Sequence, residues 1–423
     1  MNQDPVTIQS QNSSVSKTDK ELASFKYLFW TFLKIGSTAF GGFMALVSVV
    51  ENAVVQKRKL ISHEDMLDGI SLAAILPGPM AANVVAYVGY RIRGIWGAVV
   101  SSVSVLLPSY LMIVGFTIFY LRAGEIPVVN RAFAAFIPAM VAIILTAAWR
   151  MSKKTIKSFK NWRAIAIALA SGLLLKFVGG FYITLAIVLA AGILGYIWYH
   201  NDVLRQQAAS PSPTAASSSD KDFSKLDIIL SFLALSGFLA LYLIPLPFIS
   251  DDSLARLFIT FSGMSLLLFG SGYVFIPMIQ ELVVNNYDWV TQSEFTNAIA
   301  LGQVTPGPIL ISAAFIGYAV KGLLGSIVAT VAIFFPPAML MLTCSHLLQQ
   351  IKQSSIIQAA LRGIRPAVIG LIFTAAIVFA QTAQMHWVTL LIFAGAMIAL
   401  LRFRADVILI IPIAGVLGIF LYP

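Results

Sequence analysis

Two short Pro-Gly-Pro motifs, at 77–79 and 306–308, are the residues best suited to chemistry. Two prolines remove two amide donors and glycine frees the backbone torsions, so a regular helix cannot pass through either motif. A half-helix that starts after each motif exposes amide groups and its positive dipole end, which attract an anion. The alternative is a plain helix kink. We expect an anion site built from Pro77, Gly78, Pro79, Pro306, Gly307 and Pro308.

Glycine-rich breaks precede both motifs at the same distance. Phe40-Gly41-Gly42 lies before the first motif, and Phe269-Gly270-Ser271-Gly272 lies before the second. Glycines allow unwinding or close approach of the backbone, and the alternative is small-residue helix packing. We expect the breaks to lie near the repeat interface, with Gly41, Gly42, Gly270 and Gly272 contributing to substrate binding.

Few polar residues lie near these breaks. Asn83, Gln303 and Thr305 could donate hydrogen bonds to a tetrahedral oxyanion, and the alternative is that they satisfy helix carbonyls. Lys34 is a cation within an apolar run, which makes it a binding candidate unless it snorkels to the interface. Candidates for proton coupling are Glu51, Asp68 and Glu281, each of which could equally be an ordinary interfacial carboxylate.

No metal or cofactor site is predicted. The single cysteine, Cys344, and four scattered histidines lack the spacing of metal ligands. The sequence also lacks a Walker loop, a Gly-x-Ser-x-Gly element and a His-Glu-x-x-His motif. We therefore expect no catalytic residues, and the protein is predicted not to be an enzyme.

The two motifs belong to an internal repeat. Phe40 and Pro77 match Phe269 and Pro306 at an offset of 229 residues, and Gly89 and Pro108 match Gly317 and Pro336 at 228. An odd number of membrane crossings before the second copy would invert it. Inverted repeats of secondary transporters place their site near the bilayer midplane, between the repeats.

The composition is that of a membrane protein. Of 423 residues, 59% are hydrophobic and 11% charged, whereas a soluble domain is roughly 25% charged. The net charge of +10 lies mainly in loops, which follows the positive-inside rule and argues against nucleic acid as a partner. The predicted fold is an all-α polytopic membrane protein with two inverted-topology repeats and broken helices, held in a lipid bilayer.

The predicted units follow the apolar pattern. They are a disordered polar tail (1–24), a first transporter repeat (25–200), a flexible linker (201–225), a connecting transmembrane helix (226–256) and a second, inverted repeat (257–422).

Two topologies fit these units. Either every apolar segment crosses, or 25–55, 66–90 and their counterparts are re-entrant hairpins. The hairpins place Lys57, Arg58 and Lys59 in the cytoplasm with the N-terminus, as the positive-inside rule prefers.

The motifs resemble those of the chromate ion transporter family, in its long, two-domain form. The resemblance lies in Phe40-Gly41-Gly42, Leu76-Pro77-Gly78-Pro79, Leu107-Pro108-Ser109, Phe269-Gly270-Ser271-Gly272-Tyr273 and Val304-Thr305-Pro306-Gly307-Pro308. It implies chromate export across the bacterial plasma membrane and chromate resistance.

The expected mechanism is alternating access driven by the membrane potential, with proton exchange as a second force. The alternatives are a permease for sulfate or another inorganic oxyanion, and an anion channel. A homodimer is a further expectation.

Overall fold

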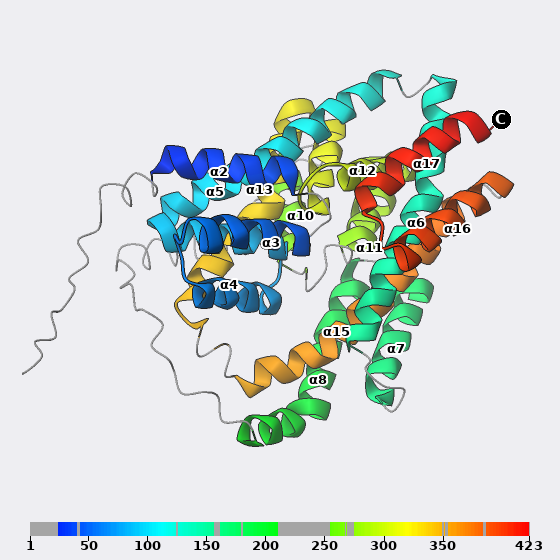
Figure 1. The fold of residues 1–423 in the computed structure, drawn as a ribbon. Coiled ribbons are helices and arrows are strands. Elements are labelled where there is room, and N and C mark those ends of the chain that lie inside the picture. The colour runs from blue at the N-terminus through cyan, green and yellow to red at the C-terminus, as the bar shows by residue number, and fades with distance from the viewer. Residues whose placement is uncertain are drawn as a thin grey trace, which may run out of the picture.

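The computed structural model describes residues 24–39, 43–123, 126–155, 161–178, 181–209, 254–266, 268, 275–348, 351, 354–383 and 386–422. All regular secondary structure in these ranges is helical, which confirms the predicted all-α fold (Figure 1). Gly41, Gly42, Gly270 and Gly272 lie outside the described residues, as do most of the predicted tail, linker and connecting helix.

The helices of the first repeat precede residue 210. They are α2 (Phe25–Thr38), α3 (Phe43–Glu51), the π-helical turn η1 (Asn52–Lys57), α4 (His63–Ile75), α5 (Met80–Ala123), α6 (Pro127–Thr155), α7 (Trp162–Val178) and α8 (Phe181–Ala209). Helix α8 continues through residues 201–209, where the sequence predicts linker, because these nine residues contain no glycine or proline.

The helices of the second repeat follow the same order. They are α10 (Leu254–Ser265), α11 (Phe275–Gln280), the π-helical turn η3 (Glu281–Asn286), α12 (Gln292–Val304), the 3₁₀ turn η4 (Ile309–Ile311), α13 (Ser312–Ser345), α15 (Ser355–Thr382), α16 (Trp387–Arg402) and α17 (Val407–Leu421).

The two repeats share their irregular backbone features. Capping boxes start α4 at Ser62 and α12 at Thr291, with the reciprocal hydrogen bonds made by Asp65 and Glu294. Each long helix after a Pro-Gly-Pro motif turns at one glycine, with φ of 63° at Gly94 and 59° at Gly322. This agreement at equivalent positions confirms the predicted repeat.

The turn at Gly94 folds α5 back on itself. A Cβ placed on Gly89 would lie 2.4 Å from the carbonyl oxygen of Gly97, so the two arms of the helix are in backbone contact. In α13, a Cβ on Gly317 would lie 2.2 Å from the carbonyl oxygen of Gly325. Both long helices are therefore hairpins of a short arm and a long arm.

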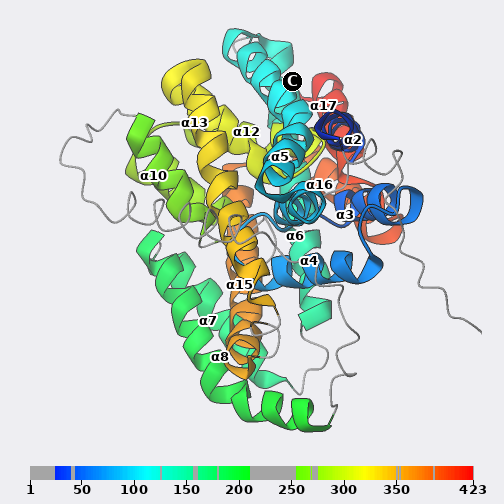
Figure 2. The same ribbon diagram turned by 90° about the vertical axis from the view of Figure 1, so that its left-hand side faces the viewer.

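The repeats exchange their last helices. Helices α7 and α8 pack on α15 of the second repeat, and α16 and α17 pack on α6 of the first (Figure 2). Helix α5 contacts its counterpart α13, and α6 contacts its counterpart α15. Outer helices of each repeat therefore pack on the other repeat, and at the centre each helix packs on its own equivalent. This arrangement is that of a pseudo-two-fold axis between the repeats.

Several helices are too short to cross a bilayer. Helices α4 and α12 have 13 residues each, which is about 20 Å of helix against a hydrocarbon core of about 30 Å. Helix α3 lies beneath α2 in Figure 1, and the two are in contact across the predicted break. These lengths favour the hairpin topology over a full crossing by every segment.

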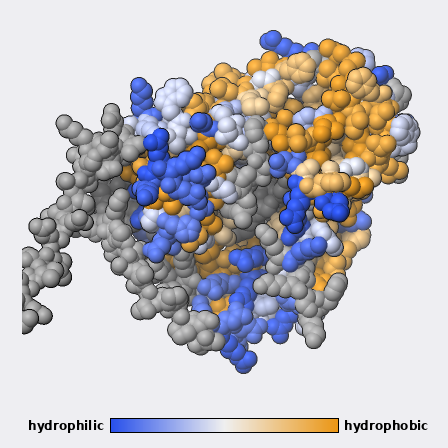
Figure 3. All heavy atoms as spheres, viewed as in Figure 1, coloured by the Kyte–Doolittle hydropathy of each residue, from blue (hydrophilic) through white to orange (hydrophobic). Residues whose placement is uncertain are grey.

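Five helices in the described ranges are long and apolar enough to cross a membrane. They cover Met80–Arg122, Pro127–Lys153, Ala186–Gln207, Ile309–Ser345 and Ser355–Gln381. The first and fourth of these are the hairpins α5 and α13, in which the long arm after Gly94 or Gly322 is the part that could cross. Apolar side chains cover the surface over α17, whereas hydrophilic ones gather over α3 and near the ends of α8 and α15 (Figure 3). The protein is therefore a polytopic membrane protein.

Candidate functional site

The Pro-Gly-Pro motifs are two loops with the same backbone conformation. Helix α4 ends at Ile75 and helix α12 at Val304, and the residues that follow, Leu76 and Thr305, have extended backbone. The glycines that follow have φ values of 109° at Gly78 and 108° at Gly307. Residues with a side chain rarely adopt this region. The helices therefore break at both predicted motifs.

Each loop is hydrogen-bonded to the opposite repeat. The Gly78 amide donates to the Leu268 carbonyl oxygen at 2.6 Å, and the Gly307 amide donates to the Ala39 carbonyl oxygen at 3.1 Å. Ala39 and Leu268 are equivalent residues that directly precede the predicted glycine breaks. The interface thus joins each Pro-Gly-Pro loop to the residue before the other repeat's break.

A second contact holds each loop from the opposite repeat. A Cβ placed on Gly78 would lie 2.2 Å from Cβ of Pro337, and one on Gly307 would lie 2.8 Å from Oγ of Ser109. The Ser109 hydroxyl also donates to the Pro306 carbonyl oxygen. Ser109 and Pro337 are equivalent positions, and our sequence analysis did not assign them to the site. The aligned prolines that precede them, Pro108 and Pro336, were the available signal.

These contacts decide which backbone amides remain for an anion. The amides of Gly78 and Gly307 are used between the repeats, and the prolines have none. The first intrahelical hydrogen bond after Pro79 comes from the Asn83 amide, at 3.0 Å. The amides of Met80, Ala81 and Ala82 precede it, so within the described part of the chain they are the unpaired donors of a helix start. In the second repeat the same role falls to the amides of Ile309 and Leu310, because Ile311 is the first to bond back to Pro308.

The Asn83 side chain lies inside this region. It is fully buried, and its Nδ2 donates to the Pro77 carbonyl oxygen at 3.2 Å. Its Oδ1 has no hydrogen-bond partner among the described residues. A buried polar atom without a partner is rare in folded proteins, so it marks a place where water or a polar ligand would be accommodated.

The remaining polar candidates differ in whether their hydrogen-bonding groups already have a partner. The buried Nε2 of Gln303 has no partner within the described ranges. The Thr305 hydroxyl donates to the Gly302 carbonyl oxygen at 2.8 Å, which is the helix-capping alternative. Lys34 is exposed on α2, whereas the first Pro-Gly-Pro loop is buried.

Glu51 and Glu281 have polar partners at or beside the π-helical turns. Oε1 of Glu51 lies 3.0 Å from Nδ1 of His63, and Asn285 donates to Glu281 at 2.7 Å. Asp68 is half-buried on α4. The three are thus spread over both repeats.

Each of these carboxylates has an amide as its repeat equivalent. Glu51 and His63 correspond to Gln280 and Gln292, whose side chains make the same contact as an uncharged hydrogen bond of 2.8 Å. Asp68 corresponds to the buried Asn297. The fold therefore accepts a neutral amide at these positions.

No group of three or more His, Cys, Asp or Glu side chains in the described ranges could hold a metal ion.

Comparison with known proteins assigns the family. The sequence profile described as "Chromate transporter" matches residues 26–196 and again residues 255–419. The chain belongs to the chromate transporter family. The two matched regions correspond to the two structural repeats.

Full-length relatives of this family member are found in bacteria and archaea. The chain is 29% identical over 396 residues to an uncharacterized transporter of Methanocaldococcus jannaschii, covering 92% of this chain and 93% of the relative. It is 28% identical over 408 residues to a chromate transport protein of Cupriavidus metallidurans, covering 95% and 94%. No solved structure matches.

A shorter relative corresponds to about one repeat. An uncharacterized transporter of Bacillus subtilis is 31% identical over 170 residues, which is 39% of this chain but 93% of that protein. A relative of this length agrees with the two-repeat organisation, because a protein about the size of one repeat corresponds to half of this chain. The family is one of transporters, so its members are not expected to be enzymes.

Proposed function

We propose that this protein is a secondary transporter that exports chromate across the bacterial plasma membrane by alternating access. The relatives named chromate transport proteins support an inorganic oxyanion as the substrate. One structural observation carries the mechanism: the reciprocal hydrogen bonds from Gly78 to Leu268 and from Gly307 to Ala39. They bring the helix breaks of both repeats to one interface.

The proposed site holds the dianion with neutral donors. The free amides at the start of α5, at Met80 to Ala82, and those of Ile309 and Leu310 supply hydrogen bonds and the positive ends of helix dipoles. Gln303 adds a buried side-chain donor, Nε2, that has no partner in the described part of the chain. The Nδ2 of Asn83 donates one hydrogen to Pro77 and has a second to offer, whereas its unpaired Oδ1 is an acceptor that suits a water and not the dianion itself. Uncharged donors suit a carrier, because the empty site must return from one side of the membrane to the other without leaving an unpaired charge buried.

The reciprocal contacts supply the moving part of the mechanism. With the repeats inverted in the membrane, loosening one loop opens the site to one side, and loosening the other opens it to the opposite side. A net backbone hydrogen bond contributes only about 0.5–1.5 kcal/mol. The membrane potential supplies about 2.3 kcal/mol per charge per 100 mV, and about twice that for a dianion. The driving force is therefore large enough to exchange the two contacts in each cycle.

Direction and coupling follow from the charge of the substrate. A potential that is negative inside drives a dianion outward without any second ion. Proton exchange would add to this force through Glu51, Asp68 or Glu281. The N-terminus is placed in the cytoplasm, where Lys57, Arg58 and Lys59 satisfy the positive-inside rule.

The test is radiolabelled chromate transport by the purified protein in proteoliposomes, with voltage and pH gradients imposed separately. We expect saturable transport that follows the imposed voltage, with counterflow of unlabelled chromate. Transport without counterflow or saturation would support a channel, and equal competition by sulfate would support a general oxyanion permease. A bulky residue at Gly78 or Gly307 should abolish export while the protein remains in the membrane. Normal export by both variants would contradict the proposed site.

A further inference from the structure

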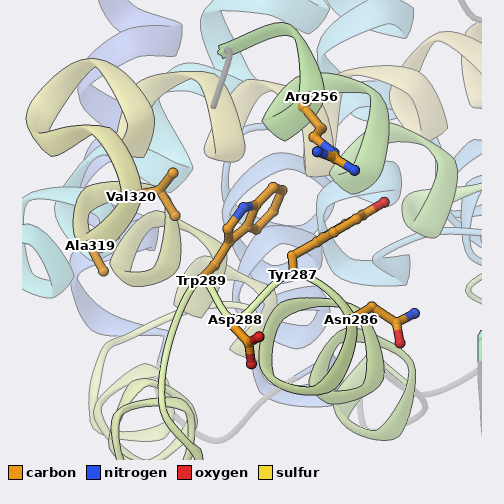
Figure 4. Close-up of a pocket in the computed structure, with 7 residues that line it drawn as sticks. All are labelled: Arg256, Asn286, Tyr287, Asp288, Trp289, Ala319 and Val320. Atoms are coloured by element: carbon orange, nitrogen blue, oxygen red, sulfur yellow. The ribbon is translucent and has the colours of Figure 1, made fainter. Parts of the chain in front are cut away.

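A polar pocket of about 460 Å³ lies in the second repeat, at the turn of α13. It is lined by Arg256, Asn286, Tyr287, Asp288, Trp289, Ala319 and Val320. The Arg256 guanidinium lies 4.6 Å from the centre of the Tyr287 ring, and the Trp289 ring lies 4.7 Å from that of Tyr287 (Figure 4). Cation–π contact and ring stacking together fix the wall of the pocket.

The first repeat builds the equivalent place with the same backbone. Lys59 has a φ of 51° and its equivalent Asp288 has 50°. The next residue closes the turn in both repeats, with Leu60 donating to the Val54 oxygen at 2.7 Å and Trp289 donating to the Val283 oxygen at 2.8 Å. Two equivalent turns therefore lie on opposite sides of the pseudo-two-fold axis.

The cation–π contact is also kept, with its partners exchanged. In the first repeat Arg58 lies 5.5 Å from the centre of the Tyr27 ring. Tyr27 is equivalent to Arg256, and Arg58 is equivalent to Tyr287. In each repeat, one arginine and one tyrosine thus hold the turn against the first helix. The turn is therefore a defined structural element in both repeats.

The two places differ in charge. The first repeat has Lys57, Arg58, Lys59 and Arg91, which we name the basic corner, where the second repeat has Asn286, Tyr287, Asp288 and Ala319. The three consecutive cations of the basic corner are exposed, whereas Arg91 is paired with Asp65. Among the pocket residues of the second repeat, Arg256 is balanced by Asp288. One place is strongly positive, and its counterpart has no net charge.

We propose that the basic corner is a collecting site for inorganic dianions at the cytoplasmic entrance, and that the pocket is its uncharged counterpart on the outer side. The proposal rests on the proposed function, because only the inverted topology places the two on opposite faces of the membrane. A cluster of exposed cations raises the local concentration and encounter rate of anions by about 10-fold or more at low salt. At physiological ionic strength the effect extends only about 8 Å.

The consequence is a kinetic difference between the two sides of the membrane. Surface cations cannot change the driving force for transport, but they lower the KM for a dianion that enters from the side on which they lie. We expect a lower KM for chromate on the cytoplasmic side, and a KM on that side that rises with ionic strength. The outer side should show a higher KM with little dependence on salt.

The test exchanges charges between the two places. K57N/K59D gives the basic corner the residues of its equivalent, which the turn tolerates since Asn286 and Asp288 adopt the same backbone. It keeps Arg58 and its contact with Tyr27. N286K/D288K is the matched converse. Radiolabelled chromate uptake is measured at low and high ionic strength in everted and right-side-out vesicles, after the membrane orientation of each variant is established by labelling an added cysteine, Q56C.

The expected results differ between the two sides of the membrane. K57N/K59D should raise the cytoplasmic KM about 3- to 10-fold at low salt, with an unchanged maximal rate and no difference from wild type at high salt. N286K/D288K should lower the KM on the outer side and make it salt-dependent. A cytoplasmic KM that keeps its wild-type salt dependence in correctly oriented K57N/K59D would overturn the inference. Absence of chromate uptake by wild type would instead overturn the proposed function.

Discussion

The two Pro-Gly-Pro glycines should respond differently to the same small substitution. In G78A the new methyl group would meet Cβ of Pro337 at 2.2 Å, an atom of a rigid and buried proline ring within α13. In G307A it would meet the Ser109 hydroxyl at 2.8 Å, which can rotate away. Because φ is the same within a degree, backbone strain is common to both variants and the neighbour decides the difference.

The magnitudes follow from these neighbours. A φ near 109° lies outside the regions that residues with a side chain adopt, so it costs an alanine about 1–3 kcal/mol in either variant. G78A adds overpacking against Pro337, about 1–3 kcal/mol. G307A adds the loss of the hydrogen bond from Ser109 to Pro306, about 0.5–1.5 kcal/mol. We therefore expect G78A to be the more destabilising variant and the poorer transporter.

Second substitutions separate steric clash from backbone strain. S109A removes the atom that meets the new methyl group of G307A, so the double variant should cost about 1 kcal/mol less than the sum of its parts. P337A removes Cγ, which would lie 2.7 Å from the new methyl group, but it keeps Cβ, the closest atom at 2.2 Å, so it should give G78A little relief. Stability is measured by thermal unfolding of the solubilised protein, and transport by chromate uptake into everted vesicles. Equal effects of G78A and G307A, with no coupling between G307A and S109A, would refute the reasoning.

Two further predictions concern the helix turns and the carboxylates. G322A should cost about 1–3 kcal/mol from backbone strain, because φ 59° with ψ −146° is a conformation that almost only glycine adopts. It should have no steric cost, since nothing lies within 4 Å of its new methyl group, whereas G325A should unfold the hairpin of α13, since its Cβ would lie 2.0 Å from the Gly317 oxygen. Thermal unfolding checks both, and a larger loss in G322A would contradict the order. E51Q/H63Q copies the uncharged pair of the second repeat, so it should fold and keep voltage-driven chromate transport. If Glu51 carries protons, stimulation by a pH gradient is lost in proteoliposomes, and undiminished stimulation would exclude that role.

Some of this structure could be predicted from local patterns. The long apolar runs predict helices, because lipid cannot satisfy backbone polar groups. The matched prolines and glycines predict both the repeat and the positions of the helix breaks, since proline and glycine act within a few residues of themselves. Helix caps such as Ser62 with Asp65 are local in the same way.

Other features of the site depend on contacts between residues far apart in the chain. The sequence predicts a break at Gly78 but not that its amide is bonded to Leu268, nor that Pro337 lies against it. Local sequence signals likewise do not show that the Thr305 hydroxyl is satisfied within its own helix, whereas Oδ1 of Asn83 has no partner among the described residues.

Local patterns along the chain are enough to predict a helical membrane protein of two similar halves, with helices that stop at Pro-Gly-Pro. Which amides have no partner among the described residues, and which residues face each other across the pseudo-two-fold axis, depends on how the two repeats pack. The physical reason is range: torsional preference and hydrophobicity act locally along the chain, whereas the pairing of Gly78 with Leu268, and of Gly307 with Ala39, exists only after the two repeats have packed together.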